Sequence, residues 1–264
     1  MFTLISPVPY RDSFLHLDKL MKATQTDSID IRSIQHINGG FIANIYKPVD
    51  WSSFDVVKKI RGITRIKKIG HAGTLDPFAE GVLLICAGKA TKEVSRLMEL
   101  PKEYNATMVL GISTDTLDKT GKVDLEKNIP PLSPKQIDDA LVHFLGKIKQ
   151  KIPDYSAAKI KGQRRYKLAR KGKEIPVSYK TVQIYNLQRD SFQSNILQFR
   201  VKCSRGTYVR VLAYDIAKKL GTVGYLSDLT RTSIGDFAIS ESLTISEFEK
   251  QWKQTNRNED ISHS

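Results

Sequence analysis

The sequence predicts an α+β fold, on the basis of three observations. Strand-like apolar runs and amphipathic helical stretches are intermixed along the chain, without the regular spacing of repeated βαβ units. The run from Val82 to Ala87 is short and wholly apolar, which is typical of a buried strand. The chain has 264 residues, of which 40% are hydrophobic, so it can bury one sizeable core.

The first part of the chain is expected to supply strands and helices on both sides of that buried strand. Residues 41–46 form an apolar strand, and the polar residues 50–53 offer caps for a following helix. The apolar residues on one face of this helix would be Phe54, Val57 and Ile60. Further on, residues 90–100 are expected to form a helix, and residues 104–110 alternate in the manner of a strand.

The second part continues the mixed pattern. Residues 133–145 predict a helix with a proline in its first turn, where the missing N–H costs little. Residues 181–189 and 196–203 are expected strands, separated by a polar turn region at Asp190 and Ser191. Residues 207–220 predict an amphipathic helix that stops at a glycine.

The chain is strongly basic, with 42 Lys and Arg residues, 28 Asp and Glu residues and a formal charge of +14. Such an excess favours a polyanionic partner, and nucleic acid is the leading candidate. Eleven basic residues lie between Lys147 and Lys173 against one acid, Asp154, with Tyr155 and Tyr166 interleaved. Aromatic rings can stack on bases while cations neutralise phosphates. A second basic run spans residues 58–68, although either run alone could be a solvated helix face.

Membrane, secreted, metal-dependent and nucleotide-dependent classes are all disfavoured. No apolar segment approaches the roughly 20 residues needed to cross a bilayer, and the N-terminus lacks a secretory signal pattern. Cys86 and Cys203 lie in apolar or strand-like runs, which suits a reducing, cytoplasmic compartment. The five histidines are scattered, so we expect no metal site. Neither a dinucleotide fingerprint nor a phosphate-binding loop with Lys followed by Ser or Thr occurs.

The stretch from Gly70 to Pro77 is the best candidate for a catalytic centre. Its glycines permit backbone angles that are closed to other residues, and Pro77 biases Asp76 towards an extended conformation. A carboxylate displayed on such a loop, at the edge of a buried strand, is a common catalytic arrangement. A turn in which Asp76 only caps the following backbone fits this local pattern equally well.

This stretch and its surrounding motifs closely resemble the TruB family of tRNA pseudouridine synthases. The further matching motifs are Lys47-Pro48 with Ser52-Ser53, Gly81-Val82-Leu83, Gly88 to Lys92, Lys102-Glu103-Tyr104, Thr114-Asp115-Thr116 with Asp118 and Gly121, Ile152-Pro153 through Arg170, Cys203 to Arg210, and Leu229-Thr230-Arg231. Their order and spacing cover residues 39–240, so similarity of one loop by chance is not a serious explanation.

The resemblance implies a pseudouridine synthase fold, with a mixed, mainly antiparallel central sheet flanked by helices and loops. It also implies isomerisation of the uridine at position 55 in the TΨC loop of tRNA to pseudouridine, without a cofactor. Asp76 would be the nucleophile, and attack on C6 of the uracil or on C1′ of the ribose both stay open. Tyr104 would stack on the target base and could accept the C5 proton, while Arg210 would pair with Asp76.

Five further residues would bind the RNA if the resemblance holds. Because the reacting face of a stacked base is covered, the target uridine must leave its stack. His71 matches a position that supports the flipped-out loop, and Leu229 matches one that lines the uracil pocket. The remaining expected contacts are Lys47, Lys159 and Tyr166. Without the resemblance, ordinary surface or core roles would be the better interpretation for such residues.

The resemblance divides the chain into an N-terminal extension over residues 1–38, a catalytic domain over 39–240, and a short C-terminal helix and tail over 241–264. Residues 14–21 of the extension could form a short helix. Bacterial members of the family commonly continue into a small RNA-binding domain, whereas only about 25 residues follow Ser240 in this sequence. We therefore expect recognition of the tRNA TΨC arm to depend mainly on the catalytic body. We expect a cytoplasmic monomer with tRNA as its partner, no membrane association and no obligate protein partner.

Three rival functions are less well supported. A non-catalytic RNA-binding protein would need only the two basic runs, but it would leave the Asp76 loop unexplained. A uridine methyltransferase would need a cofactor-binding loop and commonly a catalytic cysteine, and neither Cys86 nor Cys203 lies in a convincing active-site loop. A guide-dependent pseudouridine synthase would be expected to carry an extra RNA-docking domain.

Overall fold

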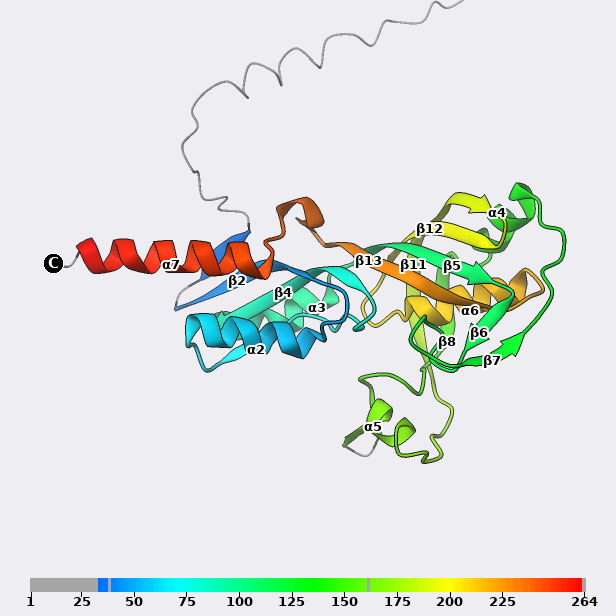
Figure 1. The fold of residues 1–264 in the computed structure, drawn as a ribbon, viewed down its shortest axis with the longest axis horizontal. Helices are drawn as coiled ribbons and strands as arrows, with labels where there is room; N and C mark the ends of the chain where they lie inside the picture. Colours follow the sequence, from blue (N-terminus) through cyan, green and yellow to red (C-terminus); the bar gives the residue numbers. More distant parts are fainter. Residues whose placement is uncertain (1–32, 38, 161, 263–264) are drawn as a thin grey trace, which may run out of the picture. The chain divides into compact units, whose positions relative to one another are not determined.

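A computed structural model of the protein describes residues 33–37, 39–160 and 162–262 (Figure 1). The predicted extension over residues 1–38 lies outside them except for its last few residues. The helix expected over residues 14–21 also lies outside the described part of the chain. No helix among the described residues is both long enough and apolar enough to span a bilayer.

One mixed sheet of ten strands organises the described residues. Eight of the strands follow the order β1-β2-β4-β13-β5-β12-β11-β8, while β3 pairs with β4 and β14 pairs with β13. The strands are β1 (Ile34–Ile37), β2 (Gly40–Lys47), β3 (Ile69–His71), β4 (Glu80–Gly88), β5 (Lys102–Leu110), β8 (Gly146–Lys151), β11 (Tyr179–Gln193), β12 (Ile196–Cys203), β13 (Gly224–Ile234) and β14 (Phe237–Ala238). Only the β4–β13 pair in this sheet is parallel, which confirms the α+β prediction and the mainly antiparallel sheet.

The remaining elements cover the sheet or form small additions to it. The helices are α2 (Ser53–Thr64), η1 (Lys89–Glu93), α3 (Val94–Glu99), α4 (Pro134–Val142), α5 (Arg165–Ala169), α6 (Val209–Lys219), η2 (Ile239–Glu241) and α7 (Ile245–Ser262). Two small antiparallel pairs are β6 (Ile112–Thr114) with β7 (Val123–Glu126) and β9 (Lys159–Ile160) with β10 (Gln163–Arg164). Helices α2 and α7 pack at the β2–β4 end of the sheet, and α4 and α6 at the β5–β12 end (Figure 1).

Helix α2 begins where the sequence predicts, and two of the three residues expected on its apolar face are buried. Ser52 caps the helix in a capping box with Asp55. The buried apolar residues are Val56, Val57 and Ile60, whereas Phe54 is 62% exposed. The prediction was wrong for Phe54 because residues spaced by three drift around a helix of 3.6 residues per turn, which moves Phe54 away from the core.

Three predicted boundaries also differ from the structure. The helix expected over residues 90–100 is split into a 3-10 turn and the short α3. Helix α4 ends at Val142, before the predicted residue 145. Strand β11 continues through the expected turn at Asp190, which pairs with Arg200 across the sheet at 2.7 Å. A polar residue fits this exposed strand because its side chain is satisfied by a neighbouring strand, and a bulge there absorbs the irregularity.

Both ends of the described chain join the core at strand β2. Strand β1 pairs with β2, so the sheet already begins within the last residues of the predicted extension. At the other end, the Leu243 N–H donates to Asn44 and the Leu243 carbonyl accepts from Tyr46. In α7, Phe248 is fully buried and its ring lies 5.8 Å from that of Phe41. The C-terminal helix is therefore part of the hydrophobic core.

We predict that Gly81→Ala destabilises the protein by more than about 2 kcal/mol. Gly81 has φ of +105°, and a Cβ atom would lie 2.3 Å from the Arg231 carbonyl oxygen on the parallel partner strand. Gly62→Ala is the matched control, because a Cβ on this exposed α2 glycine meets nothing within 4 Å. The control should gain about 0.5–1 kcal/mol in helix stability. Urea unfolding measures both, and equal stabilities for Gly81→Ala and wild type would contradict the prediction.

Candidate active site

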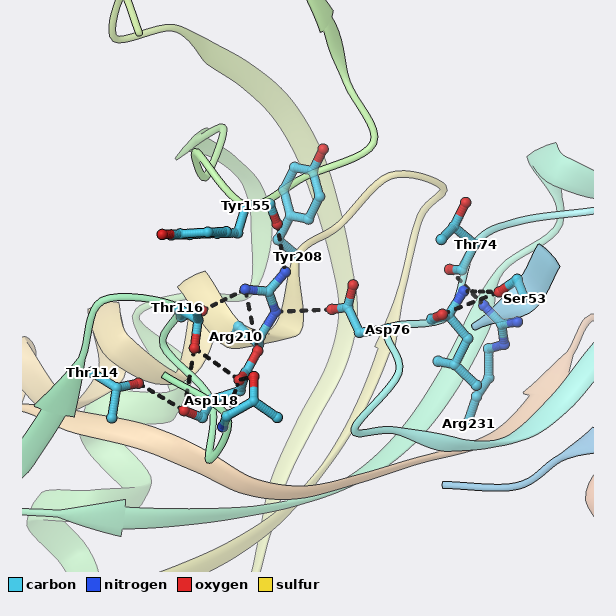
Figure 2. A network of polar contacts seen from close by, with 12 residues as sticks. Ser53, Thr74, Asp76, Thr114, Thr116, Asp118, Tyr155, Tyr208, Arg210 and Arg231 are labelled. Atoms are coloured by element: carbon cyan, nitrogen blue, oxygen red, sulfur yellow. Dashed lines mark hydrogen bonds and ion pairs between the residues drawn. The ribbon is translucent and has the colours of Figure 1, made fainter. Parts of the chain in front are cut away.

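Asp76 lies on the loop between β3 and β4, and the first residue of α2 fixes the loop beside it. The Ser53 hydroxyl accepts a hydrogen bond from the Leu75 N–H at 2.9 Å and donates to the Leu75 carbonyl at 3.1 Å (Figure 2). Both hydrogen bonds are buried, so water does not compete for either of them. The N–H and the carbonyl of Leu75, the residue before Asp76, are thus both held by Ser53.

Two buried cations hold the rest of this loop through backbone carbonyls. Arg231 on β13 donates from Nε to Val82 at 2.7 Å. Its other nitrogens reach Gly73 at 3.2 Å and Thr74 at 3.4 Å. On the opposite side, the Lys47 ammonium donates to three carbonyls. These belong to Pro48 at 2.7 Å, Trp51 at 2.7 Å and Pro77 at 3.4 Å.

The structure places Lys47 inside the protein. The residue is 0% exposed, and its ammonium is occupied by backbone carbonyls. Burial, reinforced by the positive charge of Arg231, lowers the pKa of Lys47 to about 8. Lys47 therefore braces the Asp76 loop in this structure, and its expected contact with RNA stays a prediction. The local sequence contains no sign of this burial, because burial depends on the packing of other segments.

Arg210 on α6 makes the contact with Asp76 that the resemblance implies. Arg210 Nε lies 2.8 Å from Asp76 Oδ2, in a charge-assisted hydrogen bond (Figure 2). The Arg210 side chain is buried, whereas the Asp76 side chain is 34% exposed. Oδ1 of Asp76 accepts no hydrogen bond from the described residues. One carboxylate oxygen is therefore anchored while the group stays accessible from outside.

The other guanidinium nitrogens of Arg210 join two further segments to the site. Nη1 donates to the Thr116 carbonyl and lies 3.5 Å from a carboxylate oxygen of Asp118. Nη2 donates to the Tyr155 carbonyl at 3.0 Å. Figure 2 shows Arg210 at the centre of these partners. Thr116 and Asp118 belong to one of the matching motifs, but the sequence predicts no role for either, and a backbone carbonyl such as that of Tyr155 leaves no sequence signal.

Asp118 is held as tightly as Arg210. It is buried, and its Oδ1 accepts hydrogen bonds from Thr116 Oγ1 at 2.8 Å, the Thr120 N–H at 3.0 Å and Thr120 Oγ1 at 2.5 Å. The Thr114 hydroxyl also donates to the Asp118 carbonyl at 2.7 Å. A buried carboxylate needs such donors and a nearby cation to stay charged. Hydrogen bonds therefore fix the segment around Asp118 next to the Arg210 guanidinium.

Tyr104 and Leu229 lie in the same buried cluster as Leu75, the residue before Asp76. Tyr104 is on β5 and faces Arg231 in the strand register, while Leu229 lies on the adjacent β13. Burial raises the pKa of Tyr104 above its ordinary value, so the phenol is neutral near pH 7. The structure thus places an aromatic ring and an apolar side chain beside the Asp76 loop.

His71, Lys159 and Tyr166 occupy two different parts of the protein. His71 ends β3, and burial, with the nearby Arg231 charge, lowers its pKa, which leaves the imidazole neutral near pH 7. Lys159 on β9 is exposed, and the half-buried Tyr166 on α5 lies under the Arg170 guanidinium at 5.7 Å. Both belong to the segment between β8 and β11, which reaches the site through the Tyr155 carbonyl.

The site contains neither a thiolate nor a cluster suited to a metal. Cys86 and Cys203 are buried, and burial raises the pKa of Cys86 to about 12 and that of Cys203 to about 11. Both thiols are therefore protonated and poor nucleophiles near pH 7. Among the described residues, no three His, Cys, Asp or Glu side chains are grouped in a way that could hold a metal ion.

Known proteins with similar sequences match most of this chain. A family model described as TruB family pseudouridylate synthase (N terminal domain) matches residues 61–209. The tRNA pseudouridine synthase B of Clostridium tetani is 44% identical over 210 residues, which cover 80% of this chain and 73% of that protein. The protein of the same name from Caldanaerobacter subterraneus is 45% identical and covers 79% of this chain and 74% of the relative.

Solved structures agree with the sequence matches. The crystal structure of a Cbf5-Nop10-Gar1 complex has a similar chain, with a TM-score of 0.64 and 28% identity. The match covers 86% of this chain but only 57% of that one. A structure of an H/ACA RNP bound to a substrate RNA gives a TM-score of 0.61 at 26% identity, with 81% and 55% of the two chains covered. With a family model over more than half of its 264 residues and relatives at 44–45% identity, the chain belongs to the TruB family of pseudouridylate synthases.

Proposed function

We propose that this protein is a tRNA pseudouridine synthase that isomerises uridine 55 in the TΨC loop to pseudouridine. The observation that carries the proposal is the Asp76 carboxylate, which is one-third exposed and anchored at 2.8 Å by the buried Arg210. Family membership supplies the reaction, and the names of the similar proteins from Clostridium tetani and Caldanaerobacter subterraneus supply the tRNA substrate. The formal charge of +14 suits that substrate.

In the proposed mechanism, Asp76 acts as a nucleophile through its accessible carboxylate. Attack on C1′ would displace the uracil and form a ribosyl ester, whereas attack on C6 would form an adduct with the base. Either route ends with the N-glycosidic bond broken, a C5–C1′ bond formed, the C5 proton lost and N1 protonated, and Asp76 is released unchanged. Arg210 holds the carboxylate in place, so its orientation is set before the substrate arrives.

The proposed binding site uses the side chains that surround the Asp76 loop. The flipped-out uracil stacks on Tyr104 and contacts Leu229, and His71 supports the vacated RNA loop. Lys159 and Tyr166 contact the RNA from the segment between β8 and β11. The buried phenol of Tyr104 suits stacking, whereas it can accept the C5 proton only as the phenolate, which burial disfavours by raising its pKa.

We further propose that the protein works alone, as a monomer in the cytoplasm, on the TΨC arm of tRNA and without a cofactor. The similar chain in the Cbf5-Nop10-Gar1 complex assembles with protein partners, and the H/ACA RNP contains RNA. The sequence relatives at 44–45% identity are named as tRNA pseudouridine synthases, which favours direct action on tRNA. Gel filtration with light scattering and activity assays on purified protein test these points.

The central test is nucleotide-resolution pseudouridine mapping on an unmodified tRNA. Wild type should modify position 55, and Asp76→Asn should lower the rate by at least about 10⁴-fold, because an amide is a much weaker nucleophile. Asp139→Asn is the matched control, since Asp139 lies exposed on α4 in a pair with Lys135. Unchanged product formation in Asp76→Asn would refute the catalytic assignment, and absence of product with wild type would refute the function.

Tyr104→Phe separates stacking from proton transfer. The phenylalanine ring keeps the stacking surface but removes the Tyr104 oxygen. We expect tRNA affinity to change less than about threefold and kcat to fall by roughly 10²-fold or more, the usual range for a lost acid–base group. Single-turnover rates and filter binding measure the two effects. A fully active Tyr104→Phe enzyme would restrict Tyr104 to stacking.

Asp118→Asn tests whether the segment around Asp118 positions Arg210 and, through it, Asp76. The substitution removes a buried charge 3.5 Å from Arg210 Nη1 but keeps the size of the side chain. We expect kcat to fall by about 10–100-fold through misplacement of Arg210 and Asp76, with tRNA affinity largely kept. Asp190→Asn, which breaks the exposed pair with Arg200, should leave kcat unchanged. Equal kcat values for Asp118→Asn and wild type would contradict this coupling.

A further inference from the structure

The segment from Ile152 to Ser178, here called the basic loop, leaves the sheet between β8 and β11 and returns to it at the same place. The Ile152 N–H donates to the Ser178 carbonyl at 2.9 Å, and Lys151 pairs with Tyr179 in the adjoining strands. Figure 1 shows the basic loop, with α5, extending away from the sheet. Its two ends therefore form a narrow neck.

One buried side chain, that of Arg165, fills this neck and contacts both ends. Where the chain leaves β8, Nε donates to the Pro153 carbonyl at 3.2 Å and Nη2 to the Asp154 carboxylate at 2.7 Å. Where the chain returns to β11, Nη1 donates to the Pro176 carbonyl at 3.2 Å and the Ser178 hydroxyl at 2.9 Å. The planar guanidinium thus spans the neck with all three of its nitrogens.

The backbone of the same residue ties the neck to the body of the basic loop. The Arg165 N–H donates to the Ala158 carbonyl at 2.8 Å, and the next residue, Tyr166, donates to Ser156 at 3.1 Å. Arg165 is only 1% exposed, in a loop whose other basic side chains are mostly exposed. A buried guanidinium is costly unless its donors are satisfied, so this arrangement specifies one conformation of the loop.

The charges of the basic loop are divided between structure and surface. Asp154 is the only acid between Lys147 and Lys173, and it pairs with the buried Arg165. None of the other described basic residues in this run forms an ion pair with a described acid. Their charges are therefore available to phosphates, whereas that of Arg165 is not.

The neck is also connected to the active site. Tyr155 directly follows Asp154, and its carbonyl accepts a hydrogen bond from Arg210 Nη2 at 3.0 Å. Arg210 in turn holds Asp76 at 2.8 Å (Figure 2). A shift of residues 153–155 would therefore remove one of the acceptors that orient Arg210.

We propose that Arg165 is a positioning residue, which locks the neck of the basic loop so that the loop is preorganised for RNA and keeps the Tyr155 carbonyl on Arg210. The proposal rests on the proposed function, because it takes RNA as the substrate. Without the lock, the loop occupies its binding conformation for only part of the time, and the apparent Kd rises in inverse proportion to that fraction. If the basic loop occupied its binding conformation for one-tenth of the time, Kd would rise about tenfold.

The test compares Arg165→Leu with Arg164→Leu, which removes the same charge from the adjacent, exposed residue. Binding of unmodified tRNA is measured as a function of salt concentration. Arg165→Leu should raise Kd about tenfold with an unchanged salt dependence, because its charge is already paired inside the protein. Arg164→Leu should weaken binding with a shallower slope of log Kd against log salt, by about one unit for a lost phosphate contact. KM should rise more than kcat falls in Arg165→Leu, since bound RNA restores the closed loop.

Limited trypsin digestion without RNA tests the lock independently of function. Arg165→Leu should be cut within residues 152–178 at least about tenfold faster than wild type and Arg164→Leu, because local opening exposes the cleavage sites. Arg165→Lys keeps the charge but loses the planar guanidinium that reaches both ends of the neck, so it should behave like Arg165→Leu. This variant controls for effects of the apolar leucine side chain. Equal digestion rates, or a reduced salt slope in Arg165→Leu, would overturn the proposal. If wild type itself failed to bind tRNA, the proposed function would fail instead.

Discussion

The guanidinium of Arg210 is the contact on which the rest of the site depends. It joins Asp76 from the β3–β4 loop, Thr116 and Asp118 from the segment after β6, and Tyr155 from the basic loop. Two carboxylates converge on this one buried cation. Without it, two carboxylates and two backbone carbonyls would lose a shared donor. The same interaction therefore fixes Asp76 in place and links the three segments that meet at the site.

Other buried cations near the site are satisfied mainly by carbonyl dipoles. Lys47 and Arg231 donate to backbone carbonyls of the Asp76 region, and Lys102 donates to Met98 and Leu100. Dipoles satisfy the donors but do not cancel their positive charge. Burial lowers the pKa values of His71, Lys47 and Lys102, and the charge of Arg231 lowers each of them further. The same positive charge also favours an anionic nucleophile and an approaching phosphate backbone.

Local sequence patterns predict the elements better than the site. The apolar runs of β2 and β4 and the helix α6 follow directly from periodicity, whereas the continuation of β11 through Asp190 depends on a cross-strand partner that no local window contains. For the site, the glycines and proline explain why Asp76 is displayed. Its partner Arg210 lies 134 residues away and came only from the resemblance. The burial of Lys47 is likewise absent from the local pattern, because burial is decided by tertiary packing.

The use of strand β2 by both ends of the described chain has a consequence for biosynthesis. Leu243 completes the hydrogen bonds of Asn44 and Tyr46, and Phe248 and Trp252 pack against Phe41, some 200 residues earlier in the chain. Because synthesis proceeds from the N-terminus, this end of the core is left open until residues 243–252 emerge from the ribosome. The apolar face of β2 and α2 is exposed throughout that time. Closure of such a distant contact is slow, so nascent chains are expected to need chaperone protection there until these residues are available to pack.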